Sequence, residues 1–147
     1  MPEIQAFRGL RYNLAQVGSL SDCIAPPYDV VDSALQNHLY GLSPYNFLRL
    51  ELNRPEPNDS DENDVYRRAA QTYRKWRTEG VLQCEPDPAI YVYQQEFDIG
   101  GEKVVRRGFM ARVKLQKFGE GRIYPHEQTH SKAKDDRLKL TRATQAN

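Results

Sequence analysis

The sequence predicts an α+β fold, in which a mixed, mostly antiparallel sheet with a long hairpin accompanies two to three helices. Apolar residues recur at three- and four-residue spacing over 63–79, which is typical of an amphipathic helix. Two β-rich segments, 89–97 and 103–115, are joined through Gly100-Gly101, which indicates a hairpin. A chain of 147 residues has the usual size of one domain, so a single α+β domain over 1–147 is expected.

Composition excludes several classes of protein. The 21 Lys and Arg nearly balance the 20 Asp and Glu, so the net charge of +1 cannot steer the whole molecule to nucleic acid or to an anionic membrane. No segment is apolar and long enough to span a bilayer, and the amino terminus lacks the pattern of a signal peptide. A cytoplasmic protein without membrane contact is therefore expected. Cys23 and Cys84 are too few and too far apart for a disulfide framework or a zinc knuckle.

The first third contains two predicted strands and a short helix. Residues 4–10 alternate loosely and predict a strand, and Pro26-Pro27 forces the following loop to be irregular. Asp32-Ser33 is a predicted helix N-cap, after which leucines 35, 39 and 42 form an apolar stripe that Gly41 and Pro44 end. Residues 46–52 alternate leucine with polar residues, which predicts a half-buried strand.

The helix at 63–79 is the element that the sequence predicts most strongly. The segment before it, 53–64, has no apolar residue and five acids, so it is expected to be a solvated loop. Arginine and lysine occupy the last turns of the helix, and Gly80 follows where a C′ glycine belongs.

The last third is basic although the whole chain is nearly neutral. Twelve lysines and arginines between residues 103 and 142 are accompanied by four acids. Any binding of an anionic partner is therefore expected from this end of the chain.

His126, Glu127 and His130 match the H-E-x-x-H pattern of zinc proteases. Such a site needs a third ligand, and no histidine, cysteine or glutamate follows His130. The lysines at 132 and 134 also place cations beside the metal. Zinc is therefore disfavoured, and a weaker divalent-metal role for His126 stays open.

The alternative is an anion site at the start of a helix that begins near Lys132. Lys132, Lys134 and Arg137 would crowd its first turns, where free backbone N–H groups and the helix dipole favour phosphate. Equally, the two lysines could simply be solvated and Arg137 could pair with Asp135 or Asp136. The sequence leaves both interpretations open.

Six short segments resemble the bacterial family known as domain of unknown function 1015. They occur in the order and spacing of that family: 7–12, 25–30, 43–46, 107–109, Pro125-His126-Glu127 with Thr129, and Lys134 with Asp136-Arg137-Leu138. Family members are more than twice as long as this chain, which ends within a predicted helix. The resemblance therefore implies an amino-terminal part, with a missing carboxy-terminal portion as its partner.

The family is similar at a distance to the ParB and sulfiredoxin-like superfamily, which binds nucleotides and includes a free-serine kinase. The resemblance implies that fold, a nucleotide or phosphorylated metabolite as ligand, Mg²⁺ as cofactor and serine-kinase-like phosphotransfer. Phosphate would be bound by Lys132, Lys134, Arg137 and Thr129. His126, Glu127 and Asp29 would be catalytic, Glu127 and His126 would also bind the metal, and Tyr28 would line the substrate side.

Two alternatives from other classes remain. The basic end could contact a nucleic-acid backbone, as ParB-like modules do, and this predicts a continuous positive face with exposed aromatic residues. The chain could instead be a non-catalytic fragment that folds only with its missing portion.

Overall fold

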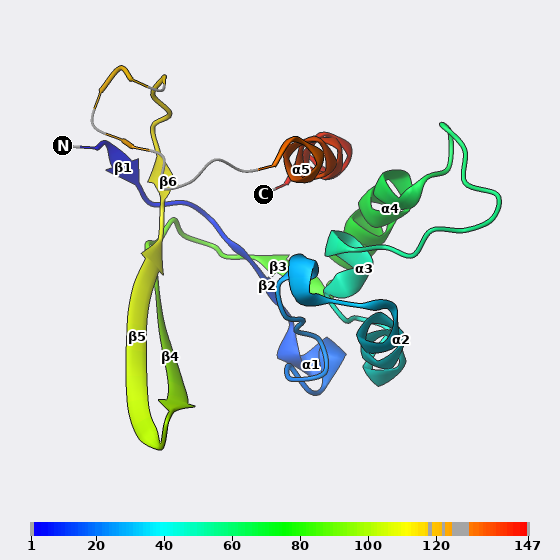
Figure 1. Ribbon diagram of the computed structural model, residues 1–147, viewed down its shortest axis with the longest axis horizontal. Coiled ribbons are helices and arrows are strands. Elements are labelled where there is room, and N and C mark those ends of the chain that lie inside the picture. The colour runs from blue at the N-terminus through cyan, green and yellow to red at the C-terminus, as the bar shows by residue number, and fades with distance from the viewer. Residues whose placement is uncertain (1, 118, 122, 125–129, 147) are drawn as a thin grey trace. The chain divides into compact units, whose positions relative to one another are not determined.

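A computed structural model describes residues 2–117, 119–121, 123–124 and 130–146 (Figure 1). The chain divides into two compact units, and each is described by itself. The strand unit comprises Met1–Leu10 and Cys84–Gln128, and the helical unit comprises Arg11–Gln83 and Thr129–Asn147. Helices and short antiparallel sheets confirm the α+β class, whereas the single domain stays a prediction.

The strand unit is built around the predicted hairpin. Strand β4 (Tyr91–Ile99) pairs antiparallel with β5 (Glu102–Met110), from Tyr91 opposite Met110 to Ile99 opposite Glu102. Gly100 and Gly101 form the two-residue turn with φ of 59° and 89°, a conformation that side chains disfavour. The hairpin prediction is confirmed. It could be made from the sequence because the glycine turn is a local feature that fixes the register of the two strands.

The predicted strand at 4–10 is wrong as one continuous element. Strand β1 (Ile4–Gln5) pairs with β6 (Arg112–Val113), and only a single bridge joins Phe7 to Ala89. The backbone N–H of Gly9 then donates to the hydroxyl of Tyr91 at 2.7 Å, so it does not continue the ladder. The Tyr91 ring lies where a side chain at position 9 would be, which explains the glycine.

The helical unit contains three helices of ten or more residues, in agreement with the two to three expected. They are α2 (Ser33–Leu42), α4 (Val65–Thr78) and α5 (Ser131–Thr144). Among the described residues, α1 (Leu14–Val17), α3 (Leu48–Glu51) and the 3₁₀ turn η1 (Tyr28–Val30) add single turns. Strands β2 (Leu10–Tyr12) and β3 (Leu82–Cys84), of which residues 11–12 and 82–83 belong to this unit, form a two-stranded ladder.

The predicted N-cap of α2 and the predicted C′ glycine of α4 are confirmed. The side chains of Asp32 and Asp64 each accept a hydrogen bond from the third backbone N–H of their helix, at 2.8 Å. Gly80 follows α4 with φ of 74°. The stripe of α2 is narrower than expected, since Leu39 is buried but Leu42 is 43% exposed.

The predicted strand at 46–52 is wrong, because this segment forms the single helical turn α3. The side-chain oxygen of Asn46 accepts from the backbone N–H of Leu48 at 3.1 Å, which bends the chain into the turn. The amide nitrogen of Asn46 donates to the carbonyl oxygens of Asp22 and Ile24 at 2.8 and 3.0 Å. The local and distant hydrogen bonds of this fully buried amide together therefore outweigh the alternating leucines.

The core lies around Trp76 of α4, which is 3% exposed. Its buried neighbours are Leu50, Val81 and Leu82. The rings of Tyr12 and Tyr45 lie with their centroids 6.0 Å from that of Trp76. Trp76 therefore belongs to the core and does not form a surface for stacking bases.

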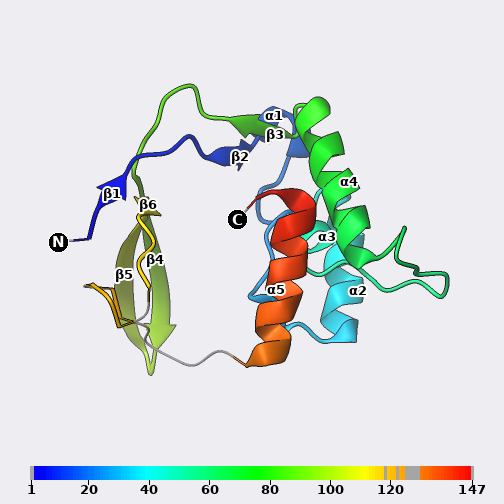
Figure 2. The same ribbon diagram turned by 90° about the horizontal axis from the view of Figure 1, so that it is seen from above.

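Helix α5 packs beside α4 in the helical unit (Figure 2). The expectation that this helix runs to the end of the chain is wrong, because it ends at Thr144 and Gln145 adopts a left-handed conformation with φ of 57°. Across the described parts of the chain, no helix combines the length and apolar character needed to cross a membrane.

Candidate anion-binding site

The first turn of α5 is unusual for a helix N-terminus. His130 is the N-cap residue, but its side chain makes no capping hydrogen bond, and the first turn holds no acid. The first helical bond runs from the backbone N–H of Lys134 to the carbonyl of His130 at 3.1 Å. The N–H groups of residues 131–133 therefore have no partner within the helix, at the end where the dipole favours an anion.

A hollow of about 400 Å³ opens beside this turn, between α5 and Tyr66 of α4. Lys132, Asp135, Asp136 and Lys139 are spaced three, four and seven residues apart, so they share one face of the helix. All four line the hollow together with Ser131 and Tyr66. Two ammonium groups, two carboxylates, a hydroxyl and a phenol therefore surround the hollow.

Asp136 lines the hollow and also bonds to Tyr66 of α4 and to Arg137. Its carboxylate accepts a hydrogen bond from the hydroxyl of Tyr66 at 2.8 Å and two from the guanidinium of Arg137. Burial alone would raise the pKa of Asp136, but these bonds from Arg137 and Tyr66 outweigh it and lower the pKa. Burial and the bond to Asp136 raise the pKa of Tyr66 to about 12. At neutral pH the pair is thus an ionised carboxylate and a neutral phenol.

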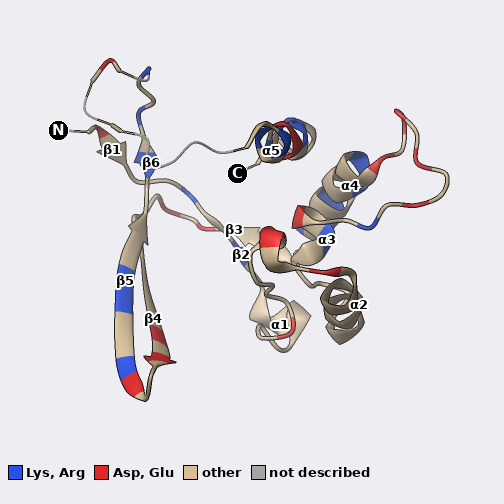
Figure 3. Ribbon diagram, viewed as in Figure 1, with Lys and Arg blue, Asp and Glu red and all other residues tan. Residues whose placement is uncertain are grey.

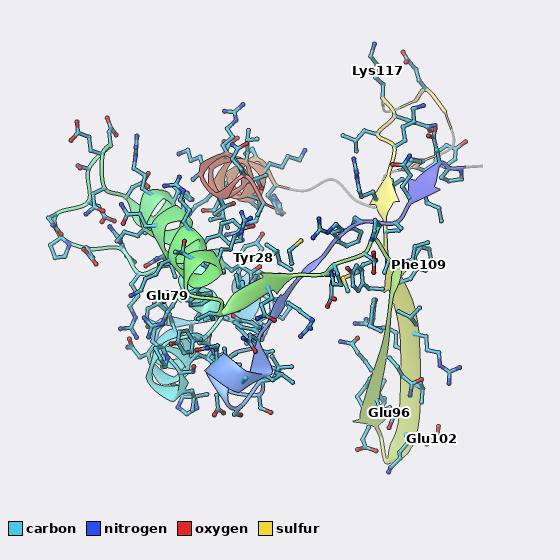
Figure 4. All side chains as sticks on the ribbon, turned by 180° about the vertical axis from the view of Figure 1, so that it is seen from behind. Tyr28, Glu79, Glu96, Glu102, Phe109 and Lys117 are labelled. Carbon is cyan, nitrogen blue, oxygen red and sulfur yellow. The ribbon has the colours of Figure 1, made fainter. Side chains whose placement is uncertain are left out.

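Arg137 lies on a neighbouring face of α5 and holds that helix to two other elements. Its guanidinium donates to the carbonyl of Glu51 in α3 at 3.0 Å and lies 3.7 Å from the Glu51 carboxylate. The same group stacks on the ring of Tyr28, 4.0 Å from its centroid. Tyr28 is labelled in Figure 4, which shows it in the helical unit. Arg137 therefore joins η1, α3 and α5.

Asp29 and Glu51 form the acidic side of this contact. Burial raises the pKa of Glu51, Arg137 opposes this change, and the charge of Asp29 adds to it. Asp29, which follows Tyr28 in η1, is thus close enough to Glu51 to influence the pKa of Glu51. The structure brings Tyr28, Asp29 and Arg137, which the sequence singled out separately, into one neighbourhood.

The remaining predicted residues fall into two groups. Lys132 lines the hollow, whereas Lys134 does not. His126, Glu127 and Thr129 lie outside the described residues, so their predicted roles stay predictions. Within the described residues, no three His, Cys, Asp or Glu side chains form a group that could hold a metal.

Sequence reasoning missed Ser131, Tyr66, Glu51 and Lys139. Lys139 could have been found, because a spacing of seven residues places it two turns below Lys132 on the same helix face. Tyr66 and Glu51 come from α4 and α3, and no local pattern links those segments to α5.

The basic end of the chain is divided between the two units. Six of its twelve cations belong to the strand unit, five belong to the helical unit, and Arg122 lies outside the described residues. Figure 3 shows that the basic bands of β5 are accompanied by acidic bands. The paired strands β4 and β5 contain three cations (Lys103, Arg106 and Arg107) and three acids (Glu96, Asp98 and Glu102). This balance gives no support to the hairpin as a nucleic-acid surface.

Comparison with known proteins gives a family but no activity. The model of the family described as "Protein of unknown function (DUF1015)" matches residues 4–147. No curated protein and no solved structure matches the chain. Because the family model covers nearly all of the sequence, the chain belongs to the DUF1015 family.

Proposed function

We propose that this chain binds the phosphate group of a nucleotide or phosphorylated metabolite in the hollow beside the first turn of α5. The observation that carries the proposal is the lining of that hollow. Lys132 places a positive charge in the first turn of a helix that has no acid there and no side-chain cap, and Lys139, two turns further along the same face, brings a second positive charge to the hollow. A cation in the first turn destabilises a helix by roughly 0.3–1 kcal/mol, unless an anion is bound.

The lining can perform the recognition of a phosphate in three ways. The free N–H groups of the first turn donate to phosphate oxygens, as at other helix N-termini that bind phosphate. The ammonium groups of Lys132 and Lys139 neutralise the charge, and the Ser131 hydroxyl supplies a further donor. Asp135 and the Asp136–Tyr66 pair disfavour a second anionic group on their side of the hollow, so they limit how the ligand is oriented.

The relation to the ParB and sulfiredoxin-like superfamily that the family resemblance implies would extend the proposal to serine-kinase-like phosphoryl transfer. Asp29 is then the candidate catalytic carboxylate, and Tyr28 lines the side of the acceptor. Mg²⁺ would neutralise phosphate charge in such a reaction. Its predicted ligands, Glu127 and His126, lie outside the described residues.

A thermal melt with and without ADP, ATP and CTP plus Mg²⁺ tests the proposal. A ligand at about 100 times its dissociation constant stabilises the folded state by roughly 2.7 kcal/mol. We expect one nucleotide to raise the melting midpoint, and the double variant Lys132→Ala/Lys139→Ala to abolish that increase.

Lys134→Ala is the matched control, because it removes the same charge from the same helix without altering the lining of the hollow. A midpoint that no nucleotide raises contradicts the proposal. So does an increase that the double variant retains in full, since the phosphate would then bind elsewhere.

A further inference from the structure

A second basic site lies in the helical unit, away from the lining of the α5 hollow. The ring of Tyr40 in α2 is contacted by two guanidinium groups. The central carbon of Arg49 lies 4.3 Å from the ring centroid and that of Arg54 lies 4.0 Å from it. Both distances are those of cation–π contacts. Arg68 of α4 joins them by donating to the carbonyl of Arg54 at 2.7 Å, and we call these three residues the arginine cluster.

The charge of the arginine cluster is only partly balanced. Arg68 pairs with Asp59 and lies 3.7 Å from Glu56, both in the acidic loop before α4. Arg49 donates to the carbonyl of Tyr40 at 2.9 Å, and within the described residues neither Arg49 nor Arg54 forms an ion pair. Two positive charges therefore stand around one phenol ring without a carboxylate.

Unsatisfied donors mark the same place. Among the described side chains, three enclosed nitrogen or oxygen atoms have no hydrogen-bond partner, and they are the Nε atoms of Arg49, Arg54 and Arg68. An enclosed donor without an acceptor costs about 1–3 kcal/mol, so such donors commonly bind a water molecule or an ion. The Nε atom of Arg68 lies 3.7 Å from the Glu56 carboxylate, which partly compensates its charge. For the Nε atoms of Arg49 and Arg54, the described residues supply no carboxylate and no other acceptor.

From this geometry we infer a second oxyanion site, in which Arg49 and Arg54 together bind a phosphate dianion at the edge of the Tyr40 ring. The central carbons of the two guanidinium groups lie 4.3 and 4.0 Å from the same centroid, so they are at most about 8 Å apart, and one tetrahedral anion between them spans that separation. The terminal nitrogens of Arg54 donate to no described residue, and they are not enclosed. Arginine offers planar paired donors that match phosphate oxygens, and a dianion balances the two unpaired charges.

Arginine Nε–Hε signals in a ¹⁵N-correlated NMR spectrum of the whole chain observe the unsatisfied donors directly. Addition of inorganic phosphate is expected to shift the signals of Arg49 and Arg54, relative to sodium chloride of equal ionic strength. The melting midpoint is expected to rise by about 3 °C or more at ten times the dissociation constant. Sulfate is expected to reproduce both effects because it is also a tetrahedral dianion, and acetate is not.

Arg54→Gln removes one of the two cations from a loop position and is expected to lose the signal shift at Arg49. Arg74→Gln is the control for net charge, because Arg74 is exposed on α4 and has no contact with the cluster among the described interactions. Lys132→Ala/Lys139→Ala is expected to keep the NMR response, so failure of the α5 proposal and failure of this inference are distinguishable.

Three results would overturn the inference. The Nε–Hε signals of wild-type protein could stay unchanged at 50-fold excess of phosphate over protein and beyond. Acetate could reproduce the phosphate response, which would show a general carboxylate or ionic effect. The response of Arg54→Gln could equal that of the wild type. The first two need no variant, so the inference can be rejected even if Arg54→Gln does not fold.

Discussion

The helical unit and the strand unit differ in how far their side chains are buried. Every buried residue among those described belongs to the helical unit, including the full set around Trp76. The hairpin of the strand unit instead exposes its apolar side chains, with Phe109 at 60%. Figure 4 labels Phe109 near one end of the hairpin and Glu96 and Glu102 near the other. The helical unit thus depends on distant contacts, whereas the hairpin depends on its turn and its backbone pairing.

Truncating the core should have the largest effect. Trp76→Ala removes the ring that Tyr12 and Tyr45 pack against, and we expect it to lower the free energy of unfolding by about 3–5 kcal/mol. Phe109→Ala on the hairpin is the matched change and should alter it by no more than about 0.5 kcal/mol. Denaturant unfolding followed by circular dichroism measures both. Equal losses would show that the hairpin depends on its apolar side chains as strongly as the core does.

Removal of Arg137 should have an intermediate effect. Arg137→Ala deletes the bonds to Glu51 and Asp136 and the stack on Tyr28, and it leaves two carboxylates without their cation. Since the side chain is 29% exposed, water offsets part of this loss, and we expect a decrease of about 1–3 kcal/mol. The exposed Arg142 of the same helix provides the control, because Arg142→Ala should be nearly neutral. A neutral Arg137→Ala would show that α5 is held by its apolar contacts alone.

The smallest effect should be on the pH dependence of stability, with opposite signs at two acids. The pKa of Asp136 is lowered, so its contribution is present above the unfolded value of about 3.9 and is lost as the pH falls through the folded value. The pKa of Glu51 is raised, so its contribution is present below about 4.3 and is lost as the pH rises through the folded value.

Asp136→Asn should therefore reduce the loss of stability in acid, and Glu51→Gln should reduce the decline as the pH rises from about 4. The free energy of unfolding between pH 3 and 7 measures both slopes. If both variants change the slope in the same direction, the two carboxylates do not have opposed environments.

Sequence patterns predicted the elements that local chemistry determines. Asp32 caps α2 and Gly80 follows α4 as expected, and Gly100-Gly101 turns the hairpin. The pattern failed at 46–52, because seven alternating residues resemble a strand and the bonds of Asn46 that decide otherwise reach distant carbonyls. A short alternating segment therefore predicts burial more safely than it predicts conformation.

The candidate site was predictable only along α5. Lys132 and Arg137 were recognised because a cation-rich helix start is a local feature. The sequence also left open whether Arg137 pairs with a neighbouring acid, and its bonds to Asp136 support that alternative without testing its role toward phosphate. Glu51 and Tyr66 could not be assigned, since the packing of α3, α4 and α5 brings them to the site.

The amide of Asn46 has a consequence for the loop that carries Tyr28. One nitrogen atom holds two carbonyls at 22 and 24, just before the prolines, while the oxygen of the same amide starts α3. Conversion of this amide to a carboxylate, as in spontaneous deamidation, would replace a donor by an acceptor that repels both carbonyls. Deamidation of this one side chain would then free the loop that leads from residue 22 to Tyr28, and with it the position of Tyr28 against Arg137.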